Sequence, residues 1–205
     1  VSEFNNEKNY LKYINKDWDL YKPASTYNES LPDNNPYEGK LYGSSAPVFP
    51  YDLKKMYEKN DAGILRSTPF GNDLLADFAK KAIEKEELGK DNITDFLTVS
   101  FSSTDYVGHL LGPRSMELQD TYLRLDQTIA DFLTYLDKTV GKNDYLLFLT
   151  ADHAGAENVI YLKDRKYDVD NYPSKDFRKS LQDFSVKTFG VNLLLNYSNF
   201  NVFFN

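Results

Sequence analysis

The stretch SFSSTDYVGHLLGP, residues 100–113, decides the fold because a strand-like run stops there and charged groups follow at once. The run, TDFLTVSF at residues 94–101, is short, apolar and rich in β-formers, which predicts a buried strand. After it come Asp105, Gly108 and His109. We expect a turn eased by the glycine, in which the carboxylate and the imidazole can reach one point.

A second Asp and His pair follows a second strand-like run. DYLLFLTA, residues 144–151, is apolar almost throughout, and Asp152 and His153 come directly after it. Between the two runs, residues 115–141 carry apolar side chains at intervals of three and four, which predicts a long amphipathic helix. Strand, helix and strand form a βαβ unit with parallel strands, so both pairs are expected at the same edge of one sheet.

Both of the chain's 2 histidines thus stand beside aspartates at equivalent strand ends. Imidazole nitrogen and carboxylate oxygen bind Zn²⁺ at about 2.0 to 2.2 Å, whereas Mg²⁺ and Mn²⁺ favour more oxygen. The chain has 0 cysteines, so thiolate zinc sites and disulfides are excluded. Either pair alone could be a surface ion pair or a satisfied polar group. Their coincidence favours a metal site with Asp105, His109, Asp152 and His153 as ligands.

A known family matches these motifs. The stretch from Ser67 to Pro113, then DTYLRLD and FLTADHAG, closely resembles the alkaline phosphatase superfamily, specifically the bacterial phosphate-irrepressible type. This type is related to type I phosphodiesterases and nucleotide pyrophosphatases. The resemblance is dense over residues 67–155 and thinner outside them.

The resemblance implies a function and a cofactor. Asp105 and His109 look like ligands of one zinc ion, and Asp152 and His153 like ligands of a second. In the family, two metals about 4 Å apart clamp the attacking and leaving oxygens of phosphoryl transfer. The implied reaction is hydrolysis of phosphate monoesters through a phospho-threonine intermediate. A phosphodiesterase or nucleotide pyrophosphatase is the alternative enzyme, because it shares these metal motifs.

Other parts of the family's site have no counterpart in this chain. The threonine nucleophile, the Asn and Lys/Arg groups on the phosphate, a further aspartate and a third histidine are missing, so no residue of this chain is assigned a catalytic role. We interpret the chain as an internal fragment of a longer enzyme, inactive by itself, with its zinc sites half built and able to remain empty. A non-catalytic scaffold is the alternative from another class.

The fold class expected is α/β, an incomplete, mostly parallel sheet flanked by helices, with loop-rich additions. Residues 1–66 are read as a helix and a covering loop, residues 67–155 as the α/β core, and residues 156–205 as an insert or cap-like segment. Helices are expected at about residues 72–88 and 175–188, and one or two short strands near the end. Asp120, Arg124 and Asp126 are assigned to the polar face of the helix over residues 115–141, with packing of one of them beneath the site as the alternative.

Composition limits the partners. A net charge of -7 argues against nucleic acid or an anionic membrane surface as a partner, and no apolar run is long enough to cross a bilayer. The expected partner is a phosphate ester substrate of the parent enzyme. Exposed surface in the fragment could cause self-association. Localisation in the periplasm or outside the cell is inferred from the family alone.

Overall fold

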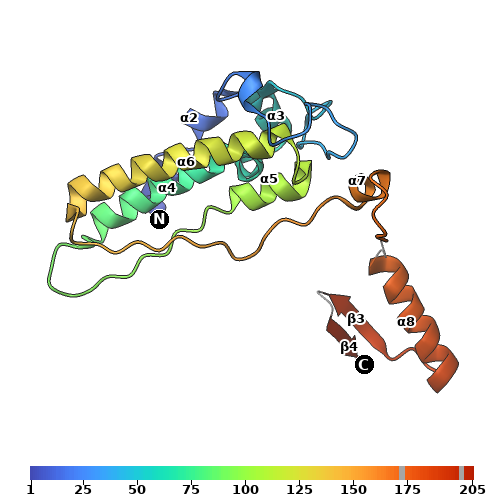
Figure 1. Ribbon diagram of the computed structural model, residues 1–205. Helices are drawn as coiled ribbons and strands as arrows, with labels where there is room; N and C mark the ends of the chain where they lie inside the picture. Colours follow the sequence, from blue (N-terminus) through green and yellow to red (C-terminus); the bar gives the residue numbers. More distant parts are fainter. Residues whose placement is uncertain (171–173, 199–200) are drawn as a thin grey trace. The chain divides into compact units, whose positions relative to one another are not determined.

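The computed structural model describes residues 1–170, 174–198 and 201–205, which fall into two compact units, residues 1–158 and 159–205. Figure 1 labels most of the helices and two of the strands. The helices are α1 (Ser2–Asn6), α2 (Leu11–Ile14), α3 (Leu53–Lys59), α4 (Pro69–Lys85), α5 (Ser103–Leu111), α6 (Met116–Leu136), α7 (Val159–Asp164) and α8 (Ser174–Phe189). The strands are β1 (Asp17–Trp18), β2 (Tyr51–Asp52), β3 (Leu194–Ser198) and β4 (Asn201–Phe204), with helical turns η1 (Ala24–Thr26), η2 (Ala62–Ser67) and η3 (Asp137–Gly141).

Helices α4 and α6 lie side by side and form the long layer of the first unit (Figure 1). The contact between them is an apolar cluster of Ala79, Ile83, Phe132 and Leu136. The helix expected at residues 72–88 is confirmed. It begins earlier, at Pro69, because proline fits the first helical position, where no backbone N–H is needed.

The long helix expected from Ser115 is also confirmed. The Ser115 side chain accepts a hydrogen bond from the Leu118 N–H at 3.1 Å and so caps the first turn of α6. The final turn, η3, is a π-type turn that ends at Gly141. Gly141 has φ +126, and a Cβ there would lie 2.2 Å from the Asp144 carboxylate, so this stop requires glycine.

A second apolar cluster fixes α5 in the first unit. Val107 and Leu111 of α5 are fully buried against Trp18, Ile14 and Leu53 in a core that also contains residues of α2, α3 and η2. The turn expected around Gly108 is therefore wrong: residues 103–111 are helical. Burial of these apolar side chains stabilises one continuous helix, and Gly108 at its centre does not interrupt it.

The expected parallel sheet is not seen in the described residues. They form two small antiparallel sheets, β1 with β2 and β3 with β4, and residues 94–101 and 144–151 belong to neither. Both segments run as extended traces in Figure 1, with Phe96 91%, Leu146 80% and Phe148 81% exposed. A strand needs a hydrogen-bonded neighbour, and neither segment has one in the described part of the chain.

The second unit contains α7, α8 and the antiparallel pair of strands β3 and β4. The Ser185 hydroxyl of α8 donates to the Val191 carbonyl at 2.8 Å and accepts from the Leu193 N–H at 2.8 Å, which ties the chain after α8 back to the helix. Phe177 packs on Tyr197 with ring centroids 4.9 Å apart. The helix and the strands expected here are confirmed. Among the described residues, no helix has both the length and the apolar character that a membrane crossing requires.

Candidate metal centre

Helix α5 presents Asp105 and His109 on one face. The two residues are one helical turn apart, and Asp105 Oδ1 lies 3.3 Å from His109 Nε2. The opposite face of the helix holds Val107 and Leu111 in the core, so the two polar side chains point outward. Helix packing thus brings a carboxylate oxygen and an imidazole nitrogen together before any metal is present.

Buried Asn72 of α4 holds the start of α5. Its Oδ1 accepts the Ser103 N–H at 3.2 Å, and its Nδ2 donates to Thr104 Oγ1 at 3.1 Å. The first N–H groups of a helix have no partner within the helix, and Asn72 supplies one from outside. Asp105 therefore follows a fixed helix start.

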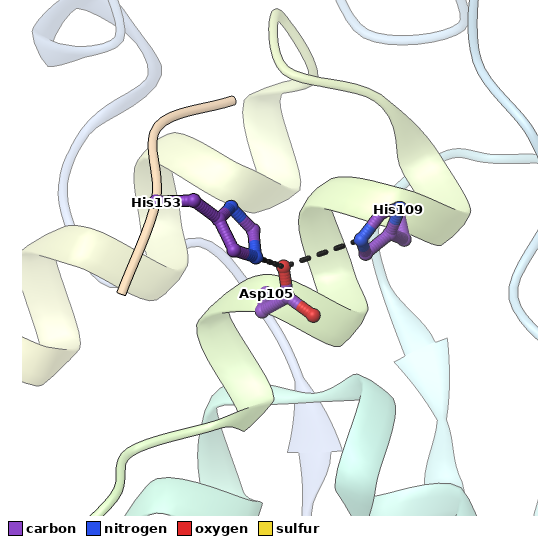
Figure 2. A group of neighbouring side chains, drawn as sticks. All are labelled: Asp105, His109 and His153. Atoms are coloured by element: carbon purple, nitrogen blue, oxygen red, sulfur yellow. Dashed lines mark ion pairs between the residues drawn. The ribbon is translucent and has the colours of Figure 1, made fainter. Parts of the chain in front are cut away.

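His153 reaches the same place from a distant part of the sequence. Its Nε2 lies 3.5 Å from Asp105 Oδ1, and the rings of His109 and His153 are 6.4 Å apart. Figure 2 shows Asp105 between the two imidazoles. One ligand atom from each of the three side chains lies within 4.8 Å of the other two, which is compact enough for one ion to touch all three.

Asp152 stands outside this group. Its Oδ2 is 3.6 Å from His153 Nε2, but the side chain is 86% exposed, and Oδ1 accepts the His153 N–H. The sequence suggested pairing Asp105 with His109 and Asp152 with His153. In the structure both pairs are close, at 3.3 Å and 3.6 Å between carboxylate oxygen and ring nitrogen. His153 Nε2 also lies 3.5 Å from Asp105 Oδ1, so Asp105, His109 and His153 form one exposed group.

This group fits a zinc ion. Two imidazole nitrogens and one carboxylate oxygen are a common donor set for Zn²⁺ and leave a fourth position for water or substrate. Because all three side chains are exposed, an ion could enter without opening the core.

The profile of the type I phosphodiesterase / nucleotide pyrophosphatase family matches residues 8–198. The chain belongs to this family. Alkaline phosphatase PafA of Elizabethkingia meningoseptica is 43% identical over 206 residues, 100% of this chain and 37% of that protein. A Myroides odoratus protein named calcium-transporting ATPase is 45% identical over 208 residues, 100% of this chain and 38% of that protein. Alkaline phosphatase PhoV of Synechococcus elongatus is 51% identical over 159 residues, 78% of this chain and 28% of that protein.

The fold of PafA matches as well. Its wild-type crystal structure superposes with a TM-score of 0.92 at 43% identity, over 100% of this chain and 39% of that one. The membership in the alkaline phosphatase superfamily inferred from the motifs is confirmed, and the chain has the fold of the corresponding part of PafA. It spans well under half the length of these relatives.

Sequence reasoning missed the role of Asp120. We assigned it to a polar face, but its side chain is fully buried and accepts hydrogen bonds from Trp18 Nε1, the Tyr21 N–H, the Tyr27 hydroxyl and Arg124 Nε. It therefore joins α6 to the loop that follows β1. The signal was available: a loop rich in aromatic N–H and O–H donors needs a buried acceptor.

A group of buried carboxylates was also missed. Glu117 of α6 is fully buried, with one oxygen hydrogen-bonded to the Tyr51 hydroxyl and the other without a partner among the described residues. Burial, with Asp33 and Asp120 nearby, raises the pKa of Glu117 to about 7. Burial and the charges of Glu117 and Asp33 raise the pKa of Glu38 to about 8. These groups resist ionisation in the folded chain.

Proposed function

We propose that this chain is part of a zinc-dependent phosphoesterase that hydrolyses phosphate monoesters, to which it contributes Asp105, His109, Asp152 and His153 as metal ligands. The observation that carries the proposal is the meeting of Asp105, His109 and His153 within 4.8 Å. The alkaline phosphatases among its relatives support phosphate esters as the substrate class.

The roles of the chain's own residues follow from their chemistry. His109 and His153 would donate ring nitrogens, and Asp105 a carboxylate oxygen, to one ion. Asp152, whose Oδ2 lies 3.6 Å from His153 Nε2, would donate a carboxylate oxygen to a second ion. Bound zinc supplies positive charge for the phosphate and its leaving oxygen. The chain itself has a net charge of -7, so an anionic ester would depend on that local charge.

The threonine nucleophile and its phospho-threonine intermediate belong, in this proposal, to parts of the longer enzyme beyond this sequence. We therefore expect the isolated chain to be inactive. We also propose that the protein acts in the periplasm or outside the cell, as the resemblance implies. Recovery of the protein in the cytosolic fraction of its host would contradict that location.

Zinc titration by calorimetry tests the metal site. The wild-type chain is expected to bind zinc saturably, and the variants His109→Ala and His153→Ala are expected to bind at least about tenfold more weakly, because each loses one of three ligands. Val169→Ala, outside the proposed site, serves as a control. Equal binding by the wild-type chain and both histidine variants would reject the site.

A phosphodiesterase is the second candidate, because the matching family is named for that activity. Parallel assays of the full-length enzyme with a phosphate monoester and a phosphate diester separate the two. The proposal expects the higher kcat/KM for the monoester, and a preference for the diester would select the alternative. A scaffold without chemistry is the reading left if the full-length enzyme hydrolyses neither ester.

The exposed apolar segments, residues 94–101 and 144–151, are proposed to pair as strands with other parts of the longer enzyme. In the isolated chain the same surfaces are free to meet a second copy, since unpaired apolar strands promote association. Sedimentation velocity over a range of concentrations checks this. A monomer at every concentration would contradict self-association.

A further inference from the structure

His153 has no regular structure to hold it. Residues 144–157 form neither helix nor strand, whereas Asp105 and His109 are fixed on a packed helix. Ligands must lie within a few tenths of an ångström of their required positions for tight metal binding. Other contacts must therefore keep the chain around His153 against α5.

The contact that does so joins Arg114 and Glu157. Arg114 Nε donates to Glu157 Oε2 at 3.1 Å, and Arg114 NH2 lies 2.7 Å from Glu157 Oε1. This two-point geometry fixes direction as well as distance, which a single ion pair does not. Arg114 lies just after α5, and Glu157 shortly follows His153, so the pair links the two halves of the proposed metal centre.

Neighbouring contacts join the same two segments, the chain after His153 and the chain next to α5. The Asn158 side chain donates to the Tyr37 carbonyl at 3.1 Å, and a Cβ at Gly155 would lie 3.9 Å from Pro113 Cβ. On the side of α5, the Leu31 N–H donates to the Arg114 carbonyl at 2.8 Å, so the backbone of Arg114 is itself anchored. Glu157 thus binds an arginine whose backbone position is held by a hydrogen bond.

We propose that the Arg114–Glu157 ion pair is a positioning clamp that places His153 beside Asp105 and His109. The inference deepens the proposed function and rests on it for its metal-binding consequence. The two side chains are 41% and 35% exposed, and exposed ion pairs contribute little to folding stability. The clamp therefore acts on the site's geometry and leaves the free energy of unfolding nearly unchanged.

The first test measures zinc affinity by competition with a chelating dye. Glu157→Gln keeps the shape of the side chain but loses its charge. We expect about tenfold weaker zinc binding, at the lower end of the loss found when a residue that orients a metal ligand is changed. Arg114→Lys keeps the positive charge but cannot make the two-point contact. Its zinc affinity is expected to lie between those of the wild type and Glu157→Gln. The exchanged pair Arg114→Glu/Glu157→Arg is expected to recover much of the loss.

Two controls separate positioning from general damage. Asp183→Asn breaks an exposed ion pair with Lys179 in the second unit and is expected to leave zinc affinity unchanged. In a His153→Ala background, Glu157→Gln is expected to have no further effect, because the residue that the clamp positions is gone. A full tenfold loss in that background would overturn the proposal.

A metal-free test keeps the clamp distinct from the zinc hypothesis. The chain has 0 cysteines, so the variant His109→Cys/His153→Cys introduces one pair of thiols into a clean background. With a fixed concentration of an added thiol oxidant such as diamide, their rate of disulfide formation reports how often the two positions meet. We expect Glu157→Gln to slow it about fivefold to tenfold, with unfolding by urea unchanged.

The outcomes are distinct. If the wild-type chain binds no zinc but thiol pairing depends on Glu157, the metal site of the isolated chain fails and the clamp stands. If zinc binds and neither its affinity nor thiol pairing changes in Glu157→Gln, the clamp is overturned and the metal site stands.

Discussion

Helix α5 and the segment around His153 bring side chains to the same point by different means. In α5, one face is buried in the core through Val107 and Leu111, and the opposite face carries Asp105 and His109. The His153 segment has an exposed apolar run before it and depends on side-chain contacts such as Arg114 with Glu157. One half of the centre is thus set by local packing, and the other by contacts distant in sequence.

This difference predicts where substitutions damage folding and where they damage only the site. Changes beneath α5 should lower the free energy of unfolding. Changes along the His153 segment should leave that free energy nearly constant and alter metal binding alone.

The largest effect is expected from Asp120, which holds Trp18 in the core that supports α5. Asp120→Ala leaves several buried donors without an acceptor, so we expect a loss of about 4 kcal/mol in the free energy of unfolding. Asp126→Ala, at an exposed position of the same helix, should change it by less than about 0.5 kcal/mol. Urea denaturation measures the free energy of unfolding of both variants. Equal losses would contradict a stabilising role for the buried hydrogen bonds of Asp120.

Leu111→Ala tests the packing of α5 directly. Removing this fully buried side chain should cost about 3 kcal/mol in urea denaturation, through lost burial and a remaining cavity. Leu149→Ala in the other region, where the side chain is 73% exposed, should cost less than about 0.5 kcal/mol. Equal losses in the free energy of unfolding for the two leucine variants would contradict the difference between the two regions.

A smaller effect, and one that depends on pH, is expected at Glu117. Its pKa is raised from 4.5 to about 7, so between these values the folded chain keeps a proton that the unfolded chain has lost. Stability from this group is therefore greatest below about pH 4.5 and falls as the pH rises to about 7. Glu117→Gln removes this dependence, so relative to the wild type it should gain about 2 kcal/mol between pH 5 and pH 8.

Glu84→Gln, at an exposed position on α4, provides the matched control and should show no such gain. Urea denaturation at both pH values measures the difference. A gain that is the same for Glu117→Gln and Glu84→Gln would assign the effect to net charge.

The parts predictable from the sequence are those whose signals are local. Helices α4 and α6 follow from apolar spacing, with Pro69 and Ser115 at their starts. The proximity of the two Asp and His pairs was expected from a parallel sheet, which the described residues do not form. The same motifs also identified the family.

The missed features depend on contacts distant in sequence. Residues 94–101 and 144–151 have strand-forming side chains, but strands need neighbours, and the described residues supply none. Gly108 suggested a turn, yet buried Val107 and Leu111 keep the chain helical. Asp120 resembled a surface residue because helix charges are usually solvated, and only the position of the loop from Trp18 to Tyr27 shows that it is buried.

The most direct test of the central claim is a crystal structure of the zinc-soaked chain with anomalous diffraction recorded on both sides of the zinc edge. We predict an anomalous peak among Asp105 Oδ1, His109 Nε2 and His153 Nε2, with metal–ligand distances of about 2.0 to 2.2 Å. A peak elsewhere, or no peak at saturating zinc, would contradict the claim that α5 and the His153 segment together form a metal centre.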